Sequence, residues 1–334
     1  MSGGVDSSVA ALLLKQQGWN VVGFTLCIPN LSGGTVETGE KAARVAAELD
    51  IPHFVVHAEE EFRSCVIAPF MEAYACGLTP NPCADCNKNI KFGLLMDVAD
   101  ELAGRPLPLA TGHYARILRH SDGCFFARGR GEEKDQSYFL CDLPRELLCR
   151  LQFPLGEFTK DQVRALARES GMAVAEQAES MEVCFLSGDD YRNNLEAGSP
   201  GDIVDKKGTV LGRHKGIGGY TIGQRKGLGI AAPQPFYVLS INVALNEIVV
   251  GDQAEAYICN VSARRPNLLA PDRLRGALRG KTRSRASLSP CKIVDLTEGI
   301  LSVNFAEPQF APASGQRLVL YDEEDVLVAS GVIV

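Results

Sequence analysis

The chain has 334 residues, of which 46% are hydrophobic and 22% charged, and its net charge is −7. This composition is typical of a globular protein with two or three domains. No apolar run is long enough to span a membrane, and the eleven cysteines are odd in number and unevenly spaced, unlike a secreted disulfide framework. We therefore expect a cytoplasmic protein without membrane contact, whose cysteines are reduced thiols.

The first predicted element is a loop followed by a helix. Residues 2–8 read SGGVDSS, and Val9, Leu12 and Leu13 then follow at helical spacing until Gly18 ends the pattern. Glycines and serines before a helix present N–H and hydroxyl groups to an anion, and the helix dipole favours negative charge there. The segment lacks the lysine of the Walker phosphate loop and resembles the pyrophosphate loop of ATP pyrophosphatases.

The loop lies unusually early in the chain. In doubly wound α/β folds a phosphate loop follows the first parallel strand, yet here it begins at residue 2. We therefore expect the natural reading frame to start upstream and to encode a further apolar strand of roughly six residues.

The rest of the first half alternates between strands and helices. The sequence predicts strands at residues 20–26, 53–57 and 107–110, and helices at 41–49, 60–76 with a bend at Pro69, 89–103, and 160–170 with a capping box at Thr159 and Gln162. This alternation predicts a doubly wound α/β parallel sheet. Its ligands would bind at the carboxyl ends of the strands, near residues 2–8 and 111–114.

Residues 79–87, TPNPCADCN, form a second distinctive segment. Two prolines favour extended backbone, so we expect a rigid surface loop. Its C-x-x-C pattern by itself fits a redox pair, half of a zinc site or two ligands of a metal cluster.

The pattern changes near Ser187, where short strands and glycines begin to dominate. Strands are predicted at residues 202–204, 209–211, 236–243, 247–250, 292–296, 300–305, 317–321 and 326–334. We expect antiparallel β modules: a small central β-rich domain at 191–262 and a C-terminal antiparallel β-barrel at 263–334, after a catalytic domain at 1–190.

Basic residues are concentrated in the second half despite the acidic net charge. Residues 264–292 contain nine basic side chains and one acidic one, a local charge of +8, and a second basic cluster lies between Lys206 and Lys226. Local positive stripes of this kind suit a phosphate backbone.

Six motifs occur in one order along the chain. They are SGGVDSS at 2–8, TPNPCADCNKNIKF at 79–92, TGHYAR at 111–116, KDQSYFL at 134–140, CFL at 184–186 and YTIGQRKGLGI at 220–230. Together they resemble the tRNA-specific 2-thiouridylases, and the resemblance covers nearly the whole chain. It implies a fold like the adenine nucleotide alpha hydrolases, and ATP-dependent 2-thiolation of the wobble uridine in tRNAs of the Lys, Glu and Gln types.

The resemblance also assigns roles to residues. The nucleotide would contact Ser2, Gly3, Gly4, Val5, Asp6, Ser7, Ser8, Leu26 and Gly112, with Asp6 holding Mg²⁺. The tRNA would contact Asn81, Pro82, Cys83, His113, Lys134, Asp135, Gln136, Arg283, Ser284 and Gln316. Ser284 departs from the tyrosine common in the family, so a stacking contact is not expected there.

The resemblance makes Cys86 and Cys184 the reactive pair, which ends the reaction as a disulfide in a persulfide scheme. A cysteine desulfurase or a sulfur-relay protein would be the sulfur donor. Many family members have aspartate where this chain has Cys83. Cys83, Cys86 and Cys184 therefore form a candidate ligand set for a [4Fe–4S] cluster, which we prefer to the persulfide relay. The remaining eight cysteines are expected to be ordinary packing residues.

Two other functions remain open from the sequence. An amidating ATP pyrophosphatase would use the same loop but needs neither paired cysteines nor a basic C-terminal barrel. A non-catalytic tRNA-binding relic would retain the basic surface with an unsupported ATP loop, and would lack ATP–pyrophosphate exchange.

Overall fold

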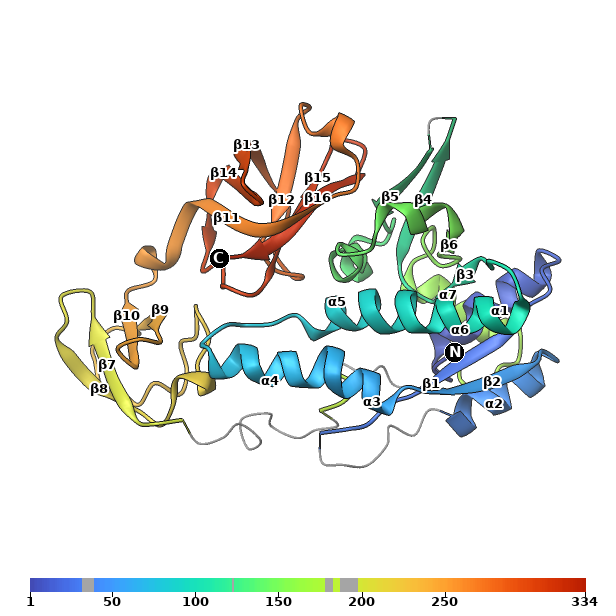
Figure 1. The fold of residues 1–334 in the computed structure, drawn as a ribbon, viewed down its shortest axis with the longest axis horizontal. Coiled ribbons are helices and arrows are strands. Elements are labelled where there is room, and N and C mark those ends of the chain that lie inside the picture. The colour runs from blue at the N-terminus through green and yellow to red at the C-terminus, as the bar shows by residue number, and fades with distance from the viewer. Residues whose placement is uncertain (32–38, 122, 178–182, 187–197) are drawn as a thin grey trace. The chain divides into compact units, whose positions relative to one another are not determined.

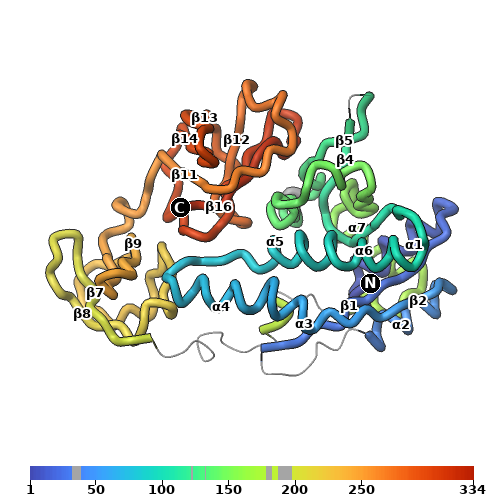
Figure 2. The backbone as a smooth tube through the Cα atoms, viewed as in Figure 1, coloured from blue at the N-terminus to red at the C-terminus, as the bar shows by residue number. Residues whose placement is uncertain are grey.

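A computed structural model describes residues 1–31, 39–121, 123–177, 183–186 and 198–334 (Figures 1 and 2). The predicted domain boundary at 190/191 lies outside the described residues. The chain divides into two compact units. The first contains Met1–Val66, Cys83–Asp189 and Glu324–Leu327, and the second contains Ile67–Pro82, Asp190–Glu323 and Val328–Val334.

The first unit contains parallel strand pairs covered by helices. Strand β1 (Gly23–Cys27) runs parallel to β2 (His53–His57), and β3 (Leu109–Ala110) runs parallel to β6 (Leu151–Gln152). Helices α1 (Val5–Gln16), α2 (Gly39–Glu48) and α7 (Lys160–Glu169) share one apolar core. Val9, Val45 and Val163, one from each helix, are completely or almost completely buried in it. The predicted α/β class is thus confirmed.

An antiparallel hairpin in the same unit was not predicted. Strands β4 (Ala115–His120) and β5 (Gly123–Arg128) pair directly after the TGHY turn. Short 3-10 helices follow at η3 (Glu132–Lys134), η4 (Ser137–Leu140) and η5 (Arg145–Arg150).

The prediction of ordinary packing is wrong for two cysteines. Cys124 on β5 and Cys149 on η5 form a disulfide, with their Cα atoms 5.3 Å apart. They are 25 residues apart in the sequence. Only the packing of η5 against β5 brings them together, so no local pattern could indicate the pair.

Residues 59–75 are helical, as predicted, but in three parts. Helix α3 (Glu59–Phe62) leads into a π-helical turn, η1 (Arg63–Ile67), and then into α4 (Ala68–Ala75). Pro69 lies in the first turn of α4, where it has no N–H to donate to the turn before it. The missing N–H of the proline is thus accommodated by a π-helical turn just before α4.

The prediction of an extended loop over residues 79–87 is wrong in its second half. Residues 82–103 are helical, through α5 (Pro82–Cys86), the π-helix η2 (Asn87–Leu94) and α6 (Leu95–Ala103). Pro82 is the first residue of α5, a position where its missing N–H has no intrahelical partner to lose. Cys83 and Cys86 are therefore three apart on one helical turn and face the same side.

The second unit contains a four-stranded sheet in the order β8-β7-β10-β9. These strands are β7 (Gly201–Asp205), β8 (Val210–His214), β9 (Tyr237–Asn242) and β10 (Glu247–Gly251). Their core includes Ile203, Val238 and Ile248, which are fully buried. The predicted all-antiparallel pairing is wrong at one place, since β10 runs parallel to β7.

The C-terminal strands form the predicted barrel, which closes in the order β11-β14-β13-β12-β15-β16. The strands are β11 (Tyr257–Leu268), β12 (Leu278–Lys281), β13 (Ser289–Thr297), β14 (Ile300–Phe310), β15 (Arg317–Tyr321) and β16 (Leu327–Ile333). Strands β11 and β12 were missed because basic residues and a proline interrupt their apolar pattern. Over the described parts of the chain, no helix has the length and apolar character needed to cross a bilayer.

Candidate active site

The predicted nucleotide loop leads directly into α1. Gly4 precedes the helix, and no side chain caps its first turn. The Ser2 and Ser7 hydroxyl oxygens lie 3.1 Å apart, and the Ser8 hydroxyl donates to the Gly4 carbonyl at 2.8 Å. The first N–H groups of a helix have no intrahelical acceptor, so this end of α1 can receive a phosphate.

Two glycines allow the loop to pack tightly. Gly3 has φ +69°, and a Cβ there would lie 2.6 Å from the Cβ of Lys41 on α2. A Cβ on Gly112 would lie 2.7 Å from the carbonyl carbon of Asp6. The loop is therefore fixed between α2 and the turn at residues 111–114, and larger side chains at these glycines would displace its backbone.

The carboxylate of Asp6 is held by two donors. The Tyr114 hydroxyl donates to its Oδ1 at 2.8 Å, and the Lys160 ammonium forms an ion pair with the same oxygen at 2.7 Å. Lys160 is the first residue of α7, and the predicted capping box of Thr159 and Gln162 is present beside it. No sequence pattern indicates this ion pair, because 154 residues separate Lys160 from Asp6.

The other predicted nucleotide contact, Leu26, lies near the carboxyl end of β1, where it pairs with Val56 of β2. Met1 runs beside the same strand: its amino group donates to the Phe24 carbonyl, and its own carbonyl accepts from the Thr25 hydroxyl at 2.7 Å. The start of the loop is thus attached to β1.

The three predicted sulfur residues belong to the first unit, and all three are reduced. Burial raises the pKa of Cys86 to about 12, and it also raises the pKa values of Cys83 and Cys184. Cys184 is exposed as a whole residue, but the protein around its sulfur still disfavours the thiolate. The charge of a Cys184 thiolate further raises the pKa values of the other two, so the three thiols share one electrostatic environment.

Lys91 places a positive charge near the three thiols. Its charge acts against burial at all three thiols, lowering each pKa. Lys91 lies in the motif at residues 79–92, but the sequence predicted no role for it. It lies five residues after Cys86, which points to different sides of an α-helix. The wider turn of the π-helix η2, whose backbone hydrogen bonds join residues i and i+5, brings such positions closer to one side.

His113 belongs to the turn at residues 111–114 and packs against the π-helix η2, which directly follows Cys86. Its Nδ1 lies 2.8 Å from the Thr111 hydroxyl oxygen, and its ring centroid is 6.1 Å from that of Phe92 and 6.3 Å from that of Phe153. Burial, followed by the charge of Lys91, lowers the pKa of His113 well below its ordinary value. The imidazole is therefore neutral at physiological pH.

Residues 134–136, a predicted tRNA contact, hold the hairpin in place. The side chain of Asp135 is 1% exposed and accepts from Arg128, Gly129 and Ser137. Gln136 accepts from the Tyr114 N–H and donates its own N–H to the Tyr114 carbonyl. The RNA contact of Lys134, Asp135 and Gln136 stays a prediction.

The remaining predicted tRNA residues lie in the second unit. Asn81 and Pro82 are buried, and the Gln316 side-chain amide donates to the carbonyls of Thr79 and Pro80, just before them. The Arg283 guanidinium donates to the carbonyls of Ile222 and Ala311 at 2.8 and 2.7 Å, and the Ser284 carbonyl accepts from Lys281 at 3.4 Å. Their contacts with RNA also stay predictions.

Arg283 lines a cavity of about 1440 Å³ within the second unit. The motif at residues 220–230 supplies much of its wall, including Lys226, and Lys215 is a further basic residue of the lining. Two of the nine basic side chains at residues 264–292 are less able to bind an external phosphate. Arg273 forms an ion pair with Asp322, and Lys281 is buried. The glycines and cations of the cavity are suited to phosphate groups.

The fold and this site define a class of protein, a nucleotide-binding α/β domain followed by a four-stranded sheet and a closed β-barrel. Family models match in that order: a tRNA methyl transferase HUP domain at residues 1–188, a tRNA methyl transferase PRC-barrel domain at 191–252, and an aminomethyltransferase beta-barrel domain at 260–333. The predicted architecture is confirmed.

Curated relatives narrow this class to one family. The chain is 43% identical to the tRNA-specific 2-thiouridylase MnmA of Geotalea uraniireducens, covering 98% of this chain and 92% of the relative. It is 44% identical to the proteins of the same name from Geobacter metallireducens and Pelobacter propionicus, each over 98% of this chain and 94% of the relative. The chain belongs to the tRNA-specific 2-thiouridylase family, which disfavours both the amidating enzyme and the non-catalytic relic.

Part of the chain also resembles a solved structure. It is a predicted subunit of a tRNA methyltransferase from Methanocaldococcus jannaschii, with a TM-score of 0.31 and 20% identity over 51% of this chain and 73% of that chain. This likeness is too weak to support an argument.

Proposed function

We propose that this protein uses ATP to activate the position-2 carbonyl oxygen of the wobble uridine in tRNA, and then replaces that oxygen with sulfur. Membership of the family supports the reaction. One observation carries the assignment of the site: the turn at residues 111–114 joins its two halves. Gly112 packs against the backbone of Asp6 in the nucleotide loop. His113 packs against Phe92 on η2, the π-helix that directly follows Cys83 and Cys86.

In the activation step the uracil oxygen attacks the α-phosphorus of ATP and pyrophosphate leaves. The N–H groups at the start of α1 bind phosphate oxygens there, and Lys160 neutralises their charge. Asp6 is proposed to hold Mg²⁺, for which oxygen is the preferred ligand. Mg²⁺ would supply positive charge to the phosphates.

The reacting base has to leave the anticodon stack before it can enter such a site. Asn81, Pro82 and His113 are proposed to receive it. Because His113 is neutral, it can accept or donate a hydrogen bond at the base without placing a cation beside Lys91.

The sulfur step depends on Cys83, Cys86 and Cys184. Three thiols in one electrostatic environment, with Lys91 to offset their charge, are suitable ligands for a [4Fe–4S] cluster, since thiolates are its normal ligands. Such a cluster would supply a sulfide for transfer to the base. Metal binding would also offset the burial that disfavours free thiolates, because the metal replaces the proton of each thiol.

The alternative is a persulfide relay between Cys86 and Cys184. The terminal sulfur of a persulfide on one cysteine attacks carbon 2, and AMP leaves with the oxygen. The other thiol then attacks the inner sulfur, which releases thiouridine and a proton and leaves a disulfide. Two electrons from an external thiol reductant restore the pair.

The following experiment tests the proposal. Cys86→Ser and Cys184→Ser should retain tRNA-dependent ATP–pyrophosphate exchange but lose thiolation, measured by mobility of the tRNA on organomercury gels. Cys76→Ser, which removes an exposed thiol, is the matched control. Loss of exchange in every variant would contradict the separation of the two steps, and near wild-type thiolation by either serine variant would refute the assignment.

Cys83 distinguishes the two sulfur mechanisms. With a cluster, Cys83→Ala should lose iron, sulfide and thiolation together after anaerobic purification, whereas Cys83→Asp should retain part of each. Equal thiolation by wild type, Cys83→Asp and Cys83→Ala would instead favour the persulfide relay.

The substrate tRNAs, the sulfur donor and the place of action are proposed from the resemblance to the tRNA-specific 2-thiouridylases. We propose tRNAs of the Lys, Glu and Gln types as substrates, a cysteine desulfurase or sulfur-relay protein as donor, and the cytoplasm as the place of action. We also retain the domain boundaries 1–190, 191–262 and 263–334 as a proposal.

A further inference from the structure

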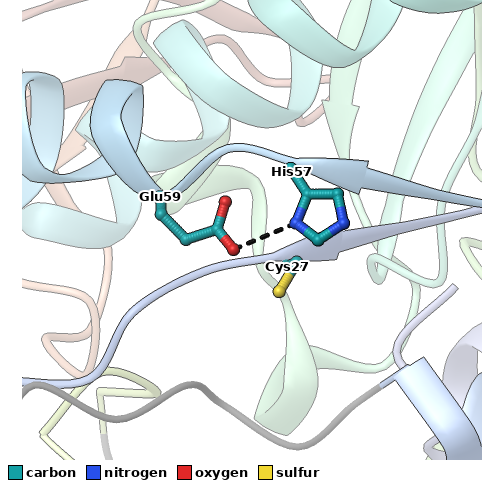
Figure 3. A group of neighbouring side chains, drawn as sticks. All are labelled: Cys27, His57 and Glu59. Atoms are coloured by element: carbon teal, nitrogen blue, oxygen red, sulfur yellow. Dashed lines mark hydrogen bonds and ion pairs between the residues drawn. The ribbon is translucent and has the colours of Figure 1, made fainter.

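A second group of metal-ligating side chains lies in the first unit, apart from the three sulfur residues. Its members are Cys27, His57 and Glu59, and their ligand atoms all lie within 4.8 Å of one another (Figure 3). Within the described ranges, this is the one group of three or more cysteine, histidine and carboxylate side chains that could share an ion in this way.

The sheet explains why these residues meet. Cys27 is the last residue of β1 and His57 the last of β2, and the parallel register pairs them directly. Paired residues on neighbouring strands point to the same face, so the thiol and the imidazole lie side by side. Glu59 begins α3 two residues later, and the Ala58 N–H donates to the Cys27 carbonyl at 3.1 Å, which holds this corner together.

The carboxylate already contacts both partners. Glu59 Oε1 lies 3.1 Å from Nδ1 of His57, and hydrogen bonds from His57 and Cys27 lower the pKa of Glu59 to about 2. Cys27 is half-buried at the end of β1, beside this carboxylate. The imidazole side chain is 75% exposed, which leaves an approach from solvent.

We propose that Cys27, His57 and Glu59 form a binding site for a divalent transition metal ion of the Zn²⁺ class. One sulfur, one imidazole nitrogen and one carboxylate oxygen are ligands that Zn²⁺ accepts, and three protein ligands leave a fourth position for water or a substrate group. Mg²⁺ and Ca²⁺ are disfavoured because they require oxygen ligands.

The test is a titration of the whole reduced protein with Co²⁺, and competition by Zn²⁺. Because Cys83, Cys86 and Cys184 are proposed above to hold a metal cluster, the titration uses the triple variant Cys83→Ser, Cys86→Ser, Cys184→Ser. This variant should bind one equivalent and show a sulfur-to-cobalt charge-transfer band. Adding Cys27→Ser should abolish the band and weaken binding by more than the roughly 10–100-fold seen for loss of an outer-shell partner.

Two further variants complete the design. Glu59→Gln should weaken Co²⁺ binding while keeping the charge-transfer band, because the thiolate remains. Cys65→Ser, which removes another half-buried thiol of the same unit, should bind like the parent variant. The proposal is overturned if the parent binds no metal, or if Cys27→Ser leaves both the band and the affinity unchanged. Circular dichroism of each variant separates loss of ligand from loss of fold.

Discussion

Replacing Lys91 by methionine should make the cysteine site less reactive. With Lys91 present, burial already raises the pKa of Cys86 to about 12. At pH 8 about one molecule in ten thousand then carries the thiolate, since each pKa unit changes the ratio tenfold. A nearby opposite charge typically lowers a pKa by about 1–3 units. Its removal should therefore slow alkylation of Cys86 by at least about tenfold.

The assay is site-resolved alkylation with iodoacetamide, followed by mass spectrometry. The exposed Cys76 in the same chain serves as the reference thiol. Lys88→Met is the matched control, because Lys88 is exposed on the same π-helix and is not among the charges that act on the three thiols. In the unmodified protein the alkylation rate of Cys86 should rise about tenfold per pH unit between pH 7 and 10 without a plateau, because only the thiolate reacts.

The reasoning would be refuted by either of two results. One is an alkylation rate of Cys86 in Lys91→Met within twofold of the wild type. The other is an equal decrease in Lys88→Met, which would show a general loss of helix structure in place of a lost charge.

Three further predictions concern the first unit. Gly112→Ala places a Cβ 2.7 Å from the backbone of the nucleotide loop and should weaken ATP binding about 5–150-fold in calorimetry, the equivalent of the roughly 1–3 kcal/mol cost of overpacking, whereas Gly39→Ala, with no atom within 4 Å of its Cβ, should bind normally. Lys160→Met should slow tRNA-dependent ATP–pyrophosphate exchange by about 10–100-fold and Lys160→Arg by less, and equal rates in both variants and wild type would remove the ammonium from the phosphate site. Cys124→Ser should lower the free energy of unfolding in urea by about 3 kcal/mol, because the 25-residue separation closes a loop in the unfolded chain, and an unchanged midpoint under oxidising conditions would contradict this.

The sequence by itself determined the features that depend on local pattern. The loop at residues 2–8 and helix α1 follow from glycines, serines and apolar spacing within one segment. The capping box of α7 follows from Thr159 and Gln162, three residues apart. Strand β2 occupies the predicted residues 53–57, because a β-branched and aromatic run there follows a proline.

Only the tertiary structure decided which distant groups meet. The ion pair of Lys160 with Asp6 and the disulfide of Cys124 with Cys149 each join elements that no periodicity relates. The group of Cys27, His57 and Glu59 depends on the register of two parallel strands, which the sequence of neither strand specifies. The role of Lys91 depends on a π-helix, a geometry that residue propensities do not encode. Side-chain chemistry is local, but the distances and burial that shift its pKa values arise from packing between segments far apart in the chain.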